Sequence, residues 1–379
     1  MTENQSLRQK KKIALVANSA WSVYNFRLDL IRHLIPRFDV LVIAPEDEFA
    51  AELKKEGCHF LNIQFNNRSV NPLLDYSLYR SLKKIYLVQK PDFIFHYVIK
   101  PNIYGSLAAA VCGIESIAVI TGLGYAFAKQ NWLNKTVSYL YKKALKRTRE
   151  VWFLNKEDAE IFIQRKLVDE KKVKILPGEG INPAYFAPQQ FRPIARTKVF
   201  QFLMSTRLLK SKGVSIYVEA ARILKKKNRD IRFELIGFFE EHHPDSITKP
   251  DIRYWQKKGY IQYNGFARDV RPFLRQADCF VFPSFYAEGI PRCLLEAASM
   301  EIPIITSLNR GCKDVVEDGV NGFICAINDA KELAKKMEDM IQLSPSQRTE
   351  MGKKGRRLVI EKFDIQKILL EYDRALADF

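Results

Sequence analysis

The sequence predicts an α/β protein built from two doubly wound domains, each with a parallel sheet covered by helices. Short apolar runs alternate with amphipathic segments from residue 13 onward, a pattern typical of a parallel sheet with helices on both faces. The alternation stops at 177–198, where four prolines and two glycines predict a linker, and then begins again. A length of 379 residues is also long for a single domain.

The two series give the expected elements in order. In the first, runs rich in branched and aromatic residues predict strands at 13–18, 40–44, 60–65, 93–98, 116–121, 151–155 and 173–176. Amphipathic segments between them predict helices, among them 25–35 and 73–89. The second series predicts strands at 199–205, 231–237, 260–265, 279–284, 302–307 and 322–326. Further helices are expected from Pro291 to Met300 and at 329–342, 345–361 and 364–377. We expect ligands at the carboxyl ends of the strands and in the cleft between the domains.

The charge indicates an anionic partner. The formal net charge is +18, and basic residues are in excess in both halves of the chain. Nucleic acid, a phospholipid surface and phosphorylated substrates would all fit this balance. The charge alone does not choose among them.

Other features bear on the compartment. The six cysteines form no C-x-x-C pair and no metal-ligand spacing with histidine, which fits a reducing cytoplasm. The longest apolar stretch, 106–128, contains Glu115 and three glycines, so we expect a helix, a turn and a strand rather than a membrane span. We therefore expect a cytoplasmic protein.

The first candidate site lies in the stretch SFYAEGIPRCLLEAASMEIPIITS, 284–307. Gly289 and Pro291 occupy a strand-to-helix turn, and the free N–H groups of a first helical turn form an anion site. Glu288 lies beside this turn, and Glu296 is eight residues further on, about 80° around a helix, so both carboxylates could face one crevice. Such a site suits a sugar nucleotide. The alternative is two surface glutamates on an ordinary helix.

The second candidate site is STRLLKSKGV, 205–214, which follows the first strand of the second domain. It contains Arg207, Lys210 and Lys212, with Gly213 before a helix. Cations in this position suit a diphosphate. A solvated basic patch is the alternative, but the same sheet supplies both candidate sites.

At these residues the chain resembles a known family. AEGIPRCLLEA resembles the E-x7-E motif of glycosyltransferase family 4, and STRLLKSKG is similar to that family's Arg and Lys diphosphate clamp. VVEDGVNGFIC, 315–325, resembles a strand and turn of the same family. VYNFR (23–27), KPNIYGSLAA (100–109) and ITGLGYAF (120–127) resemble a bacterial subgroup that transfers sugars onto undecaprenyl-diphosphate-linked oligosaccharides. This subgroup includes N-acetylgalactosaminyltransferases that act on lipid-linked diacetylbacillosamine.

The resemblance implies a GT-B fold, in which two Rossmann-like domains face each other across a cleft. An acceptor-binding domain would span 1–185, with the C-terminal helix 363–379 packing back on it, and a nucleotide-sugar domain would span 190–362. The implied activity is retaining transfer of a hexose or N-acetylhexosamine from a UDP-linked donor to a polyprenyl-diphosphate-linked sugar, in surface-polysaccharide or glycan assembly.

The resemblance also implies roles for single residues. Arg207 and Lys212 would neutralise the departing diphosphate, Glu288 would bind a hydroxyl of the donor sugar, and Glu296 would bind the ribose. The sugar and phosphate pocket would be lined by Gly289, Ile290 and Arg292, while Gly237 and the Gly265-Phe266 turn would border the base. Cations at the leaving group can replace a metal, and the chain has no Asp-x-Asp, so we expect a metal-independent enzyme with no cofactor.

In the first half, the candidate contacts to the acceptor or to phosphate are Arg27, Lys100 and Gly122. Many relatives have a histidine after the fourth strand, but His96 is expected inside that strand, where a core role is more common. Lys100 is the better loop candidate for phosphate. Arg27 could grip a phosphate or could pack on a helix surface.

The segment 129–149, KQNWLNKTVSYLYKKALKRTR, is rich in basic residues and has no acidic one. Its apolar residues fall at helical spacing, which is typical of an amphipathic helix on an anionic membrane surface. We therefore expect peripheral association with the cytoplasmic face of the inner membrane. The alternative is a core-packed helix with a solvated basic face.

Three competing functions remain at this point. The same chemistry could act on a soluble acceptor, or the fold could belong to a sugar-nucleotide epimerase that needs no acceptor. The third is nucleic-acid binding, suggested only by the charge, and the chain has no aromatic–basic RNA motif or recognition helix. We expect no nucleic-acid partner.

Overall fold

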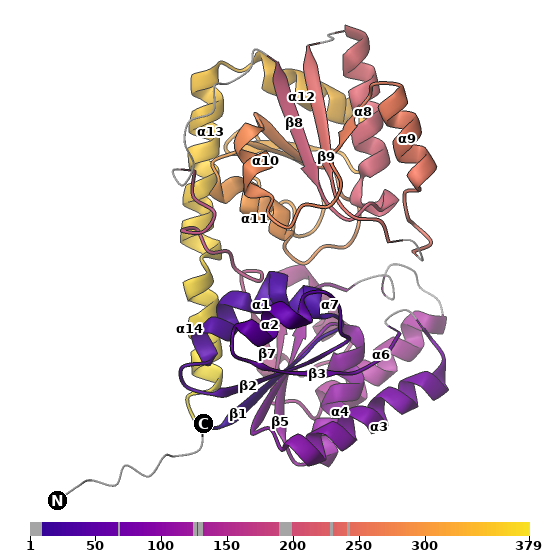
Figure 1. Cartoon of the computed structure of the whole chain (residues 1–379), viewed down its shortest axis with the longest axis vertical. Coiled ribbons are helices and arrows are strands. Elements are labelled where there is room, and N and C mark those ends of the chain that lie inside the picture. The colour runs from indigo at the N-terminus through magenta and orange to yellow at the C-terminus, as the bar shows by residue number, and fades with distance from the viewer. Residues whose placement is uncertain are drawn as a thin grey trace, which may run out of the picture. The chain divides into compact units, whose positions relative to one another are not determined.

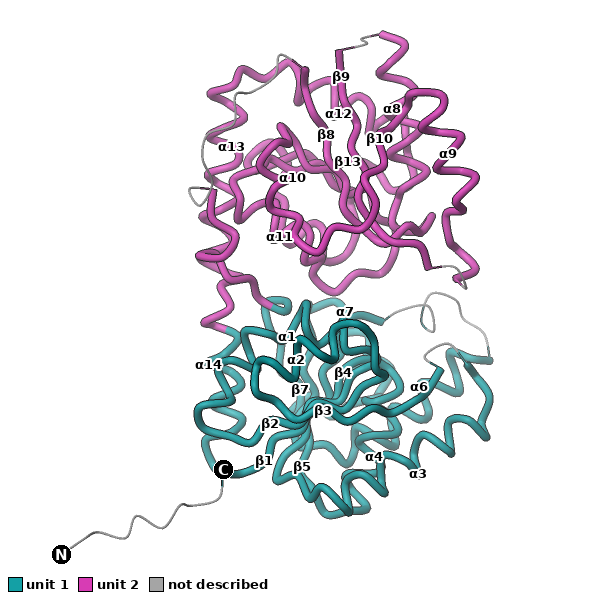
Figure 2. Tube along the Cα trace, viewed as in Figure 1, with its two compact units in different colours: residues 1–179, 368–379 teal, residues 180–367 magenta. Residues whose placement is uncertain are grey.

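The computed structural model describes residues 10–66, 69–123, 127, 132–188, 199–227, 230–240 and 243–379. The chain divides into two compact units, Met1–Glu179 with Ile368–Phe379, and Gly180–Lys367 (Figure 2). The expected domain ranges, 1–185 with 363–379 and 190–362, differ from these units by a few residues at each boundary.

Unit 1 contains a seven-stranded sheet in the order β3-β2-β1-β4-β5-β6-β7. Every neighbouring pair is parallel. The strands are β1 Lys12–Val16, β2 Asp39–Ala44, β3 His59–Asn62, β4 Phe93–Tyr97, β5 Glu115–Ile120, β6 Glu150–Phe153 and β7 Val173–Ile175. All seven predicted strands of the first series are confirmed.

The helices of unit 1 lie on both faces of this sheet. They are α1 Ala20–Leu34, α2 Ala50–Lys55, α3 Pro72–Gln89, a π-helical turn η1 Pro101–Gly105, α4 Ser106–Val111, α6 Trp132–Leu145, α7 Lys156–Gln164 and the 3₁₀ turn η2 Glu170–Lys172. Helices α3, α4 and α6 pack side by side, with η1 between α3 and α6 (Figure 1). On the opposite face, Tyr372 of the C-terminal helix α14, Ile365–Ala375, contacts Phe95 at a tilt and Trp152 edge-on.

Local capping explains where these helices begin. Helix α1 was expected from residue 25, but it begins at Ala20 because the Ser19 hydroxyl accepts a hydrogen bond from the Ser22 N–H. Asn71 caps α3 in the same way, and Pro72 occupies its first turn, where a missing N–H costs nothing. The predicted helix at 73–89 is therefore confirmed.

Unit 2 contains a six-stranded parallel sheet in the order β10-β9-β8-β11-β12-β13. The strands are β8 Phe200–Ser205, β9 Ile231–Ile236, β10 Gln262–Tyr263, β11 Cys279–Phe282, β12 Ile304–Ser307 and β13 Gly322–Cys325. All six predicted strands are present, although β11 ends at Phe282 rather than Ser284. The strand order reverses between β8 and β11, and such a switch point opens a crevice at the carboxyl ends of the strands.

The helical elements of unit 2 cover both faces of its sheet. They are η4 Lys210–Lys212, α8 Val214–Lys227, α9 Lys249–Lys257, α10 Arg271–Gln276, α11 Arg292–Ser299, α12 Ala330–Gln342, α13 Pro345–Leu358 and the π-helical turn η5 Val359–Phe363, which leads into α14. Helix α13 was expected to reach residue 361 but gives way to η5 after Leu358. In the part of the chain that the structure describes, no helix has the length and apolar character needed to cross a membrane.

Candidate active site

The loops after β8 and β11 contact each other through their backbones. The N–H groups of Phe285 and Tyr286 donate to the Ser211 carbonyl oxygen at 2.9 and 3.1 Å. Gly213 has φ +82°, and a Cβ there would lie 2.2 Å from the Pro283 carbonyl oxygen. The two sequence segments singled out above therefore meet at the switch point of the sheet.

A buried ion pair lies where these loops meet. The Lys212 ammonium donates to the Glu288 carboxylate at 2.5 Å, and both residues are less than 10% exposed, at 7% and 8%. The Ser284 hydroxyl donates to the same Glu288 oxygen at 2.8 Å. The Lys212 nitrogen also lies 4.5 Å from the centre of the Tyr286 ring. The structure thus brings Lys212 and Glu288 together.

Arg207 follows β8 at the same edge of the sheet. Its guanidinium donates to the Glu240 carboxylate at 2.9 Å, and its side chain is one-third exposed. Burial lowers the pKa of Arg207, but attraction to Glu240 and the hydrogen bond raise this pKa by more. The guanidinium therefore stays charged. Glu240 was not among the predicted site residues.

Glu296 lies in the second turn of α11, where it accepts a hydrogen bond from the Arg292 Nε at 3.1 Å. Burial raises the pKa of Glu296, and Arg292 opposes this rise only in part. The thiol of Cys293, a partly exposed residue, has a pKa raised by desolvation and also by the charges of Glu296 and Glu288. Both predicted carboxylates therefore lie near one thiol on the first turn of α11.

The segment after β12 fixes the turn that contains Glu288 and Gly289. The Asn309 side-chain amide donates to the carbonyl oxygens of Ser284, at 3.1 Å, and of Tyr286. Gly311 has φ +71°, and a Cβ at this position would lie 1.8 Å from the Gly289 carbonyl oxygen. Sequence reasoning missed Asn309 and Gly311, although both follow a predicted strand at its carboxyl end.

The residues expected to border the base follow β9 and β10. The Gly237 N–H donates to the Gly265 carbonyl at 2.9 Å, and the Tyr263 hydroxyl donates to the Gly237 carbonyl at 2.8 Å. A Cβ on Gly237 would lie 1.9 Å from the Thr206 carbonyl oxygen, so the ends of β8 and β9 are in close contact. Phe266 is 43% exposed and meets Phe238 edge-on. Ile290 is buried between β11 and α11.

In unit 1, the structure gives partners to both predicted cations. Arg27 is buried, donates to Glu179 at 2.6 Å, and lies 4.2 Å from the centre of the Tyr97 ring. Lys100 is also buried and donates to Asp75 at 2.6 Å. Each cation is therefore neutralised by a carboxylate within unit 1.

Gly122 lies in the loop after β5 with φ +136°. The rest of the quoted motif at 124–126 falls outside the described residues, as does 129–131 of the basic segment.

His96 lies within β4 and is fully buried, as the sequence predicted. Its ring nitrogens are within hydrogen-bond distance of the Tyr86 and Ser106 hydroxyls, at 2.9 and 3.2 Å. Burial lowers the pKa of His96 to about 3, so the ring is neutral at physiological pH. A structural role in the core of unit 1 accounts for these contacts.

Helix α6 corrects one part of the expectation for the basic segment. Its apolar side packs into the core of unit 1 through Tyr141, Ala144 and Leu145, with Val137 and Leu140 against the same cluster. This side is therefore not available to a bilayer. The cations of α6 lie on the exposed side, together with Trp132 and Tyr139, as in the alternative of a core-packed helix with a basic face.

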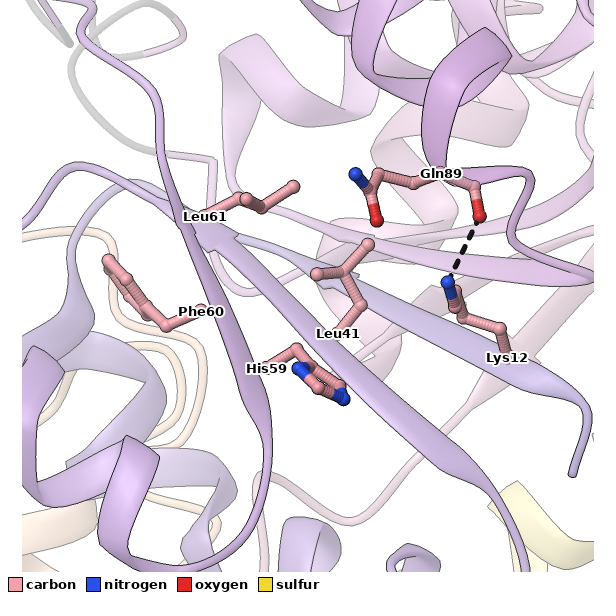
Figure 3. Close-up of a pocket in the computed structure, with 6 residues that line it drawn as sticks. All are labelled: Lys12, Leu41, His59, Phe60, Leu61 and Gln89. Carbon is pink, nitrogen blue, oxygen red and sulfur yellow. Dashed lines mark hydrogen bonds between the residues drawn. The ribbon is translucent and has the colours of Figure 1, made fainter.

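A cavity of about 190 Å³ lies elsewhere in unit 1, and Figure 3 shows its lining. The Lys12 ammonium donates to the Gln89 carbonyl oxygen there at 3.2 Å. Lys12 and His59 are the first residues of β1 and β3, so this cavity is at the amino ends of the strands. None of the predicted site residues lines it. Within the described ranges, no group of three or more His, Cys, Asp or Glu side chains could hold a metal ion.

Comparison with known proteins agrees with these elements. Residues 187–358 match the family model for glycosyl transferases group 1, and residues 12–155 match the model for glycosyl transferase 4-like domains. The chain is 28% identical to an N,N'-diacetylbacillosaminyl-diphospho-undecaprenol alpha-1,3-N-acetylgalactosaminyltransferase of Campylobacter jejuni, over 96% of this chain and 99% of the relative. It is 27% identical to a UDP-Gal:alpha-D-GlcNAc-diphosphoundecaprenol alpha-1,3-galactosyltransferase of Escherichia coli, over 77% of each chain.

Solved structures share the fold across the whole chain. A glycosyltransferase from Rickettsia africae has a TM-score of 0.79 at 20% identity and covers 97% of both chains. Anabaena HepE in complex with UDP and glucose has a TM-score of 0.79 at 17% identity, and the match covers 97% of this chain and all of HepE.

Proposed function

We propose that this chain transfers a sugar from a UDP-linked donor to a polyprenyl-diphosphate-linked sugar. The chain belongs to the glycosyl transferases group 1 family and has the GT-B fold, and both support this proposal. The transferred sugar is a hexose or N-acetylhexosamine, and transfer retains the anomeric configuration. The observation that carries this proposal is the buried Lys212–Glu288 pair, with Arg207 beside it at the carboxyl edge of the unit 2 sheet.

Arg207 and Lys212 are the groups that stabilise the departing diphosphate. Breaking the bond between the anomeric carbon and phosphate builds negative charge on the leaving oxygens, which fixed cations stabilise. An ammonium has three N–H donors, so Lys212 can bind Glu288 with one and a phosphate oxygen with another. Two such cations perform the role that a metal has in other transferases, and we propose a reaction without metal or cofactor.

Glu288 and Glu296 orient the donor through its hydroxyl groups. A carboxylate accepts hydrogen bonds, so Glu288 suits a hydroxyl of the sugar and Glu296 suits the ribose. Arg292 holds the Glu296 carboxylate in place at 3.1 Å. Gly289 and Ile290 shape the sugar pocket, and Gly237 and Phe266 border the base.

We propose the following bonding changes for retaining transfer. The bond from the anomeric carbon to phosphate breaks, and its electron pair stays on the diphosphate. The acceptor hydroxyl oxygen bonds to the same face of that carbon, and its proton passes to an oxygen of the departing phosphate. No protein nucleophile is required in this sequence of steps.

The acceptor is inferred from the relatives. The names of the relatives from Campylobacter jejuni and Escherichia coli both specify an undecaprenol-linked diphosphate sugar. A polyprenyl acceptor resides in a membrane, so we propose peripheral association with the cytoplasmic face of the inner membrane. Transfer to a soluble acceptor by the same chemistry is the competing possibility.

Calorimetric titration with UDP, with and without EDTA, tests the donor site. We expect saturable binding that EDTA leaves unchanged and that Glu296→Ala weakens at least tenfold. Glu338→Ala is the matched control, because Glu338 is also ion-paired on a unit 2 helix but lies at α12, away from this site. If UDP does not bind, GDP is titrated next. If no nucleoside diphosphate binds, the assignment of these residues as a donor site is wrong.

Turnover with a panel of UDP-sugars then tests the acceptor. Each donor is paired with a polyprenyl-diphosphate-linked sugar and with the same sugar as a water-soluble glycoside. Transfer to the lipid-linked sugar is expected to be at least tenfold faster. Equal rates on the two acceptors would favour the soluble-acceptor alternative.

A further inference from the structure

Helix α3 exposes an unusual set of side chains. Five apolar residues on its outer side are more than half exposed, from 53% for Leu74 to 78% for Leu73, and the others are Tyr76, Leu87 and Val88. At 100° per residue these five residues, with Arg80 and Lys84, fall on one half of the helix. Leu78, Leu82 and Tyr86 face the core from the opposite half.

This outer side contains no acidic residue. The one acidic residue of α3, Asp75, points the other way and binds Lys100 and Tyr104. A helix on the surface of a globular protein is expected to expose mainly polar residues, and contiguous exposed apolar residues commonly mark an interaction site. The core already occupies one apolar side of α3, so this second apolar side has another purpose.

Helix α6 adds charge to the same layer. Helix α4 contacts both α3 and α6, and the three helices cover one face of the unit 1 sheet (Figure 1). The exposed side of α6 carries Trp132, at 67% exposure, and Tyr139. It also carries the exposed cations Lys135, Lys142 and Lys143 and no acidic residue, and the exposed Lys146 and Arg147 follow directly after the helix.

We propose that this α3–α6 surface, the exposed sides of α3 and α6 just described, rests on an anionic phospholipid bilayer. The apolar residues of α3 enter the boundary between headgroups and acyl chains, while the cations of both helices bind lipid phosphates. Trp132, Tyr76 and Tyr139 suit the headgroup level, where one side of a ring is apolar and the other wet. The insertion is therefore assigned to α3, and α6 contributes mainly charge.

The inference deepens the proposed function, since a polyprenyl-linked acceptor lies in such a bilayer, but its measurement needs no turnover. Each cation near an anionic surface adds about 1 kcal/mol, which is about fivefold in partitioning. Removing two cations is therefore expected to weaken binding about 25-fold. Replacing two exposed leucines with serine is expected to weaken it at least tenfold.

The test is flotation of the full chain with vesicles of phosphatidylcholine that contain phosphatidylglycerol, compared with phosphatidylcholine alone. The variants are Leu73→Ser with Leu74→Ser, and Arg80→Ser with Lys84→Ser. Their matched controls are Ile360→Ser with Leu370→Ser, which are exposed apolar residues elsewhere, and Lys257→Ser with Lys258→Ser on α9. Circular dichroism and sedimentation velocity on the same samples report folding and oligomeric state.

We expect the wild type to float with anionic vesicles, both α3 variants to lose this binding, and both controls to keep it. Glu296→Ala should float normally, and the α3 variants should bind UDP normally, so a failed donor site and a failed membrane surface give different results. The proposal is overturned if the wild type does not float, if the α3 variants float as well as the controls, or if the surface instead joins two copies of the chain.

Discussion

At the scale of single residues, the Lys212–Glu288 pair makes a prediction that links stability to activity. Removing one partner of a buried ion pair leaves an uncompensated charge and costs about 3–5 kcal/mol. Lys212→Met should therefore lower the free energy of unfolding by this amount, because it removes the ammonium that donates to the buried Glu288 carboxylate at 2.5 Å. Denaturant unfolding of the purified variant gives the value.

The double variant Lys212→Met with Glu288→Gln separates stability from catalysis. With both charges gone, most of the lost stability should return, since a neutral amide can still accept from Ser284. Transfer should remain about 10²–10³ below wild type, because the cation at the leaving group is still missing. Recovery of activity together with stability would show that the pair serves only the fold.

Glu296 makes a prediction about pH. Burial raises its pKa, so it takes up a proton at a higher pH than an ordinary glutamate. In the proposed donor site Glu296 accepts hydrogen bonds from the ribose hydroxyls, so the ionised carboxylate is the expected binding form. The affinity for UDP should be complete above this raised pKa and should fall as the pH drops through it.

Titrations of UDP at a series of pH values, on wild type and on Glu296→Gln, measure this dependence. The amide variant should bind more weakly and lose the acid-side fall, because it has no proton to gain. If both proteins lose affinity over the same pH range, the titrating group is another residue.

These residues also show what the sequence can and cannot indicate. Spacing after predicted strands was enough to place Arg207, Lys212, Glu288 and Glu296 at the carboxyl edge of one sheet. Glu240, the partner of Arg207, and Asn309, which binds the Ser284 carbonyl oxygen, were missed because these contacts depend on how separate loops meet, and no local pattern encodes that.

At the scale of elements, Gly213 joins the loops after β8 and β11. Its φ of +82° strains any residue with a Cβ, and that Cβ would lie 2.2 Å from the Pro283 carbonyl. Gly213→Ala must therefore shift one loop, and we expect a loss of about 1–3 kcal/mol in stability and weaker binding of UDP. Chemical unfolding and UDP titration test both effects.

Gly259→Ala is the control for this substitution. Gly259 has φ +70°, but a Cβ there has nothing within 4 Å, so the variant has the backbone strain without the clash. It should lose about 1–2 kcal/mol through the left-handed backbone alone and bind UDP as the wild type does. Equal effects of the two substitutions on UDP binding would mean that the contact at Gly213 does not shape the site.

Helices and strands differed in how well they could be predicted. The strands are compact runs of branched and aromatic residues, and their period survives tertiary packing. Helix α6 was harder, because an apolar stripe at helical spacing looks the same whether it faces a core or a bilayer. Only the packing of Tyr141 and Leu145 shows that the core occupies it, and only the exposure of side chains in the folded unit singles out the outer side of α3.

At the scale of the whole molecule, each unit has its own hydrophobic core. One cluster runs from Ile181 to Phe363 and lies in unit 2, whereas two others lie within unit 1. The change in composition at 177–198 predicted a boundary in this region, and the observed one falls between Glu179 and Gly180, although Ile181 and Phe186 of the same segment pack into the core of unit 2. Chains with two cores commonly unfold in more than one step.

This organisation predicts that UDP stabilises one unit and not the other. The chain has four tryptophans, and Trp255 alone lies in unit 2, packed against its core. Fluorescence of Trp255→Phe therefore reports unit 1, and the difference from wild type reports unit 2. At 100 times its dissociation constant, UDP should stabilise unit 2 by about 2.7 kcal/mol, because it binds only the folded form.

We expect UDP to raise the thermal midpoint of the Trp255-dependent signal while the midpoint in Trp255→Phe stays where it is. In Glu296→Ala, the same concentration of UDP should leave the midpoint of the Trp255-dependent signal unchanged. This result would assign the stabilisation to the donor site rather than to nonspecific binding of a nucleotide by a chain of charge +18. An equal rise of the midpoint in Trp255→Phe would mean that the two cores unfold as one cooperative structure.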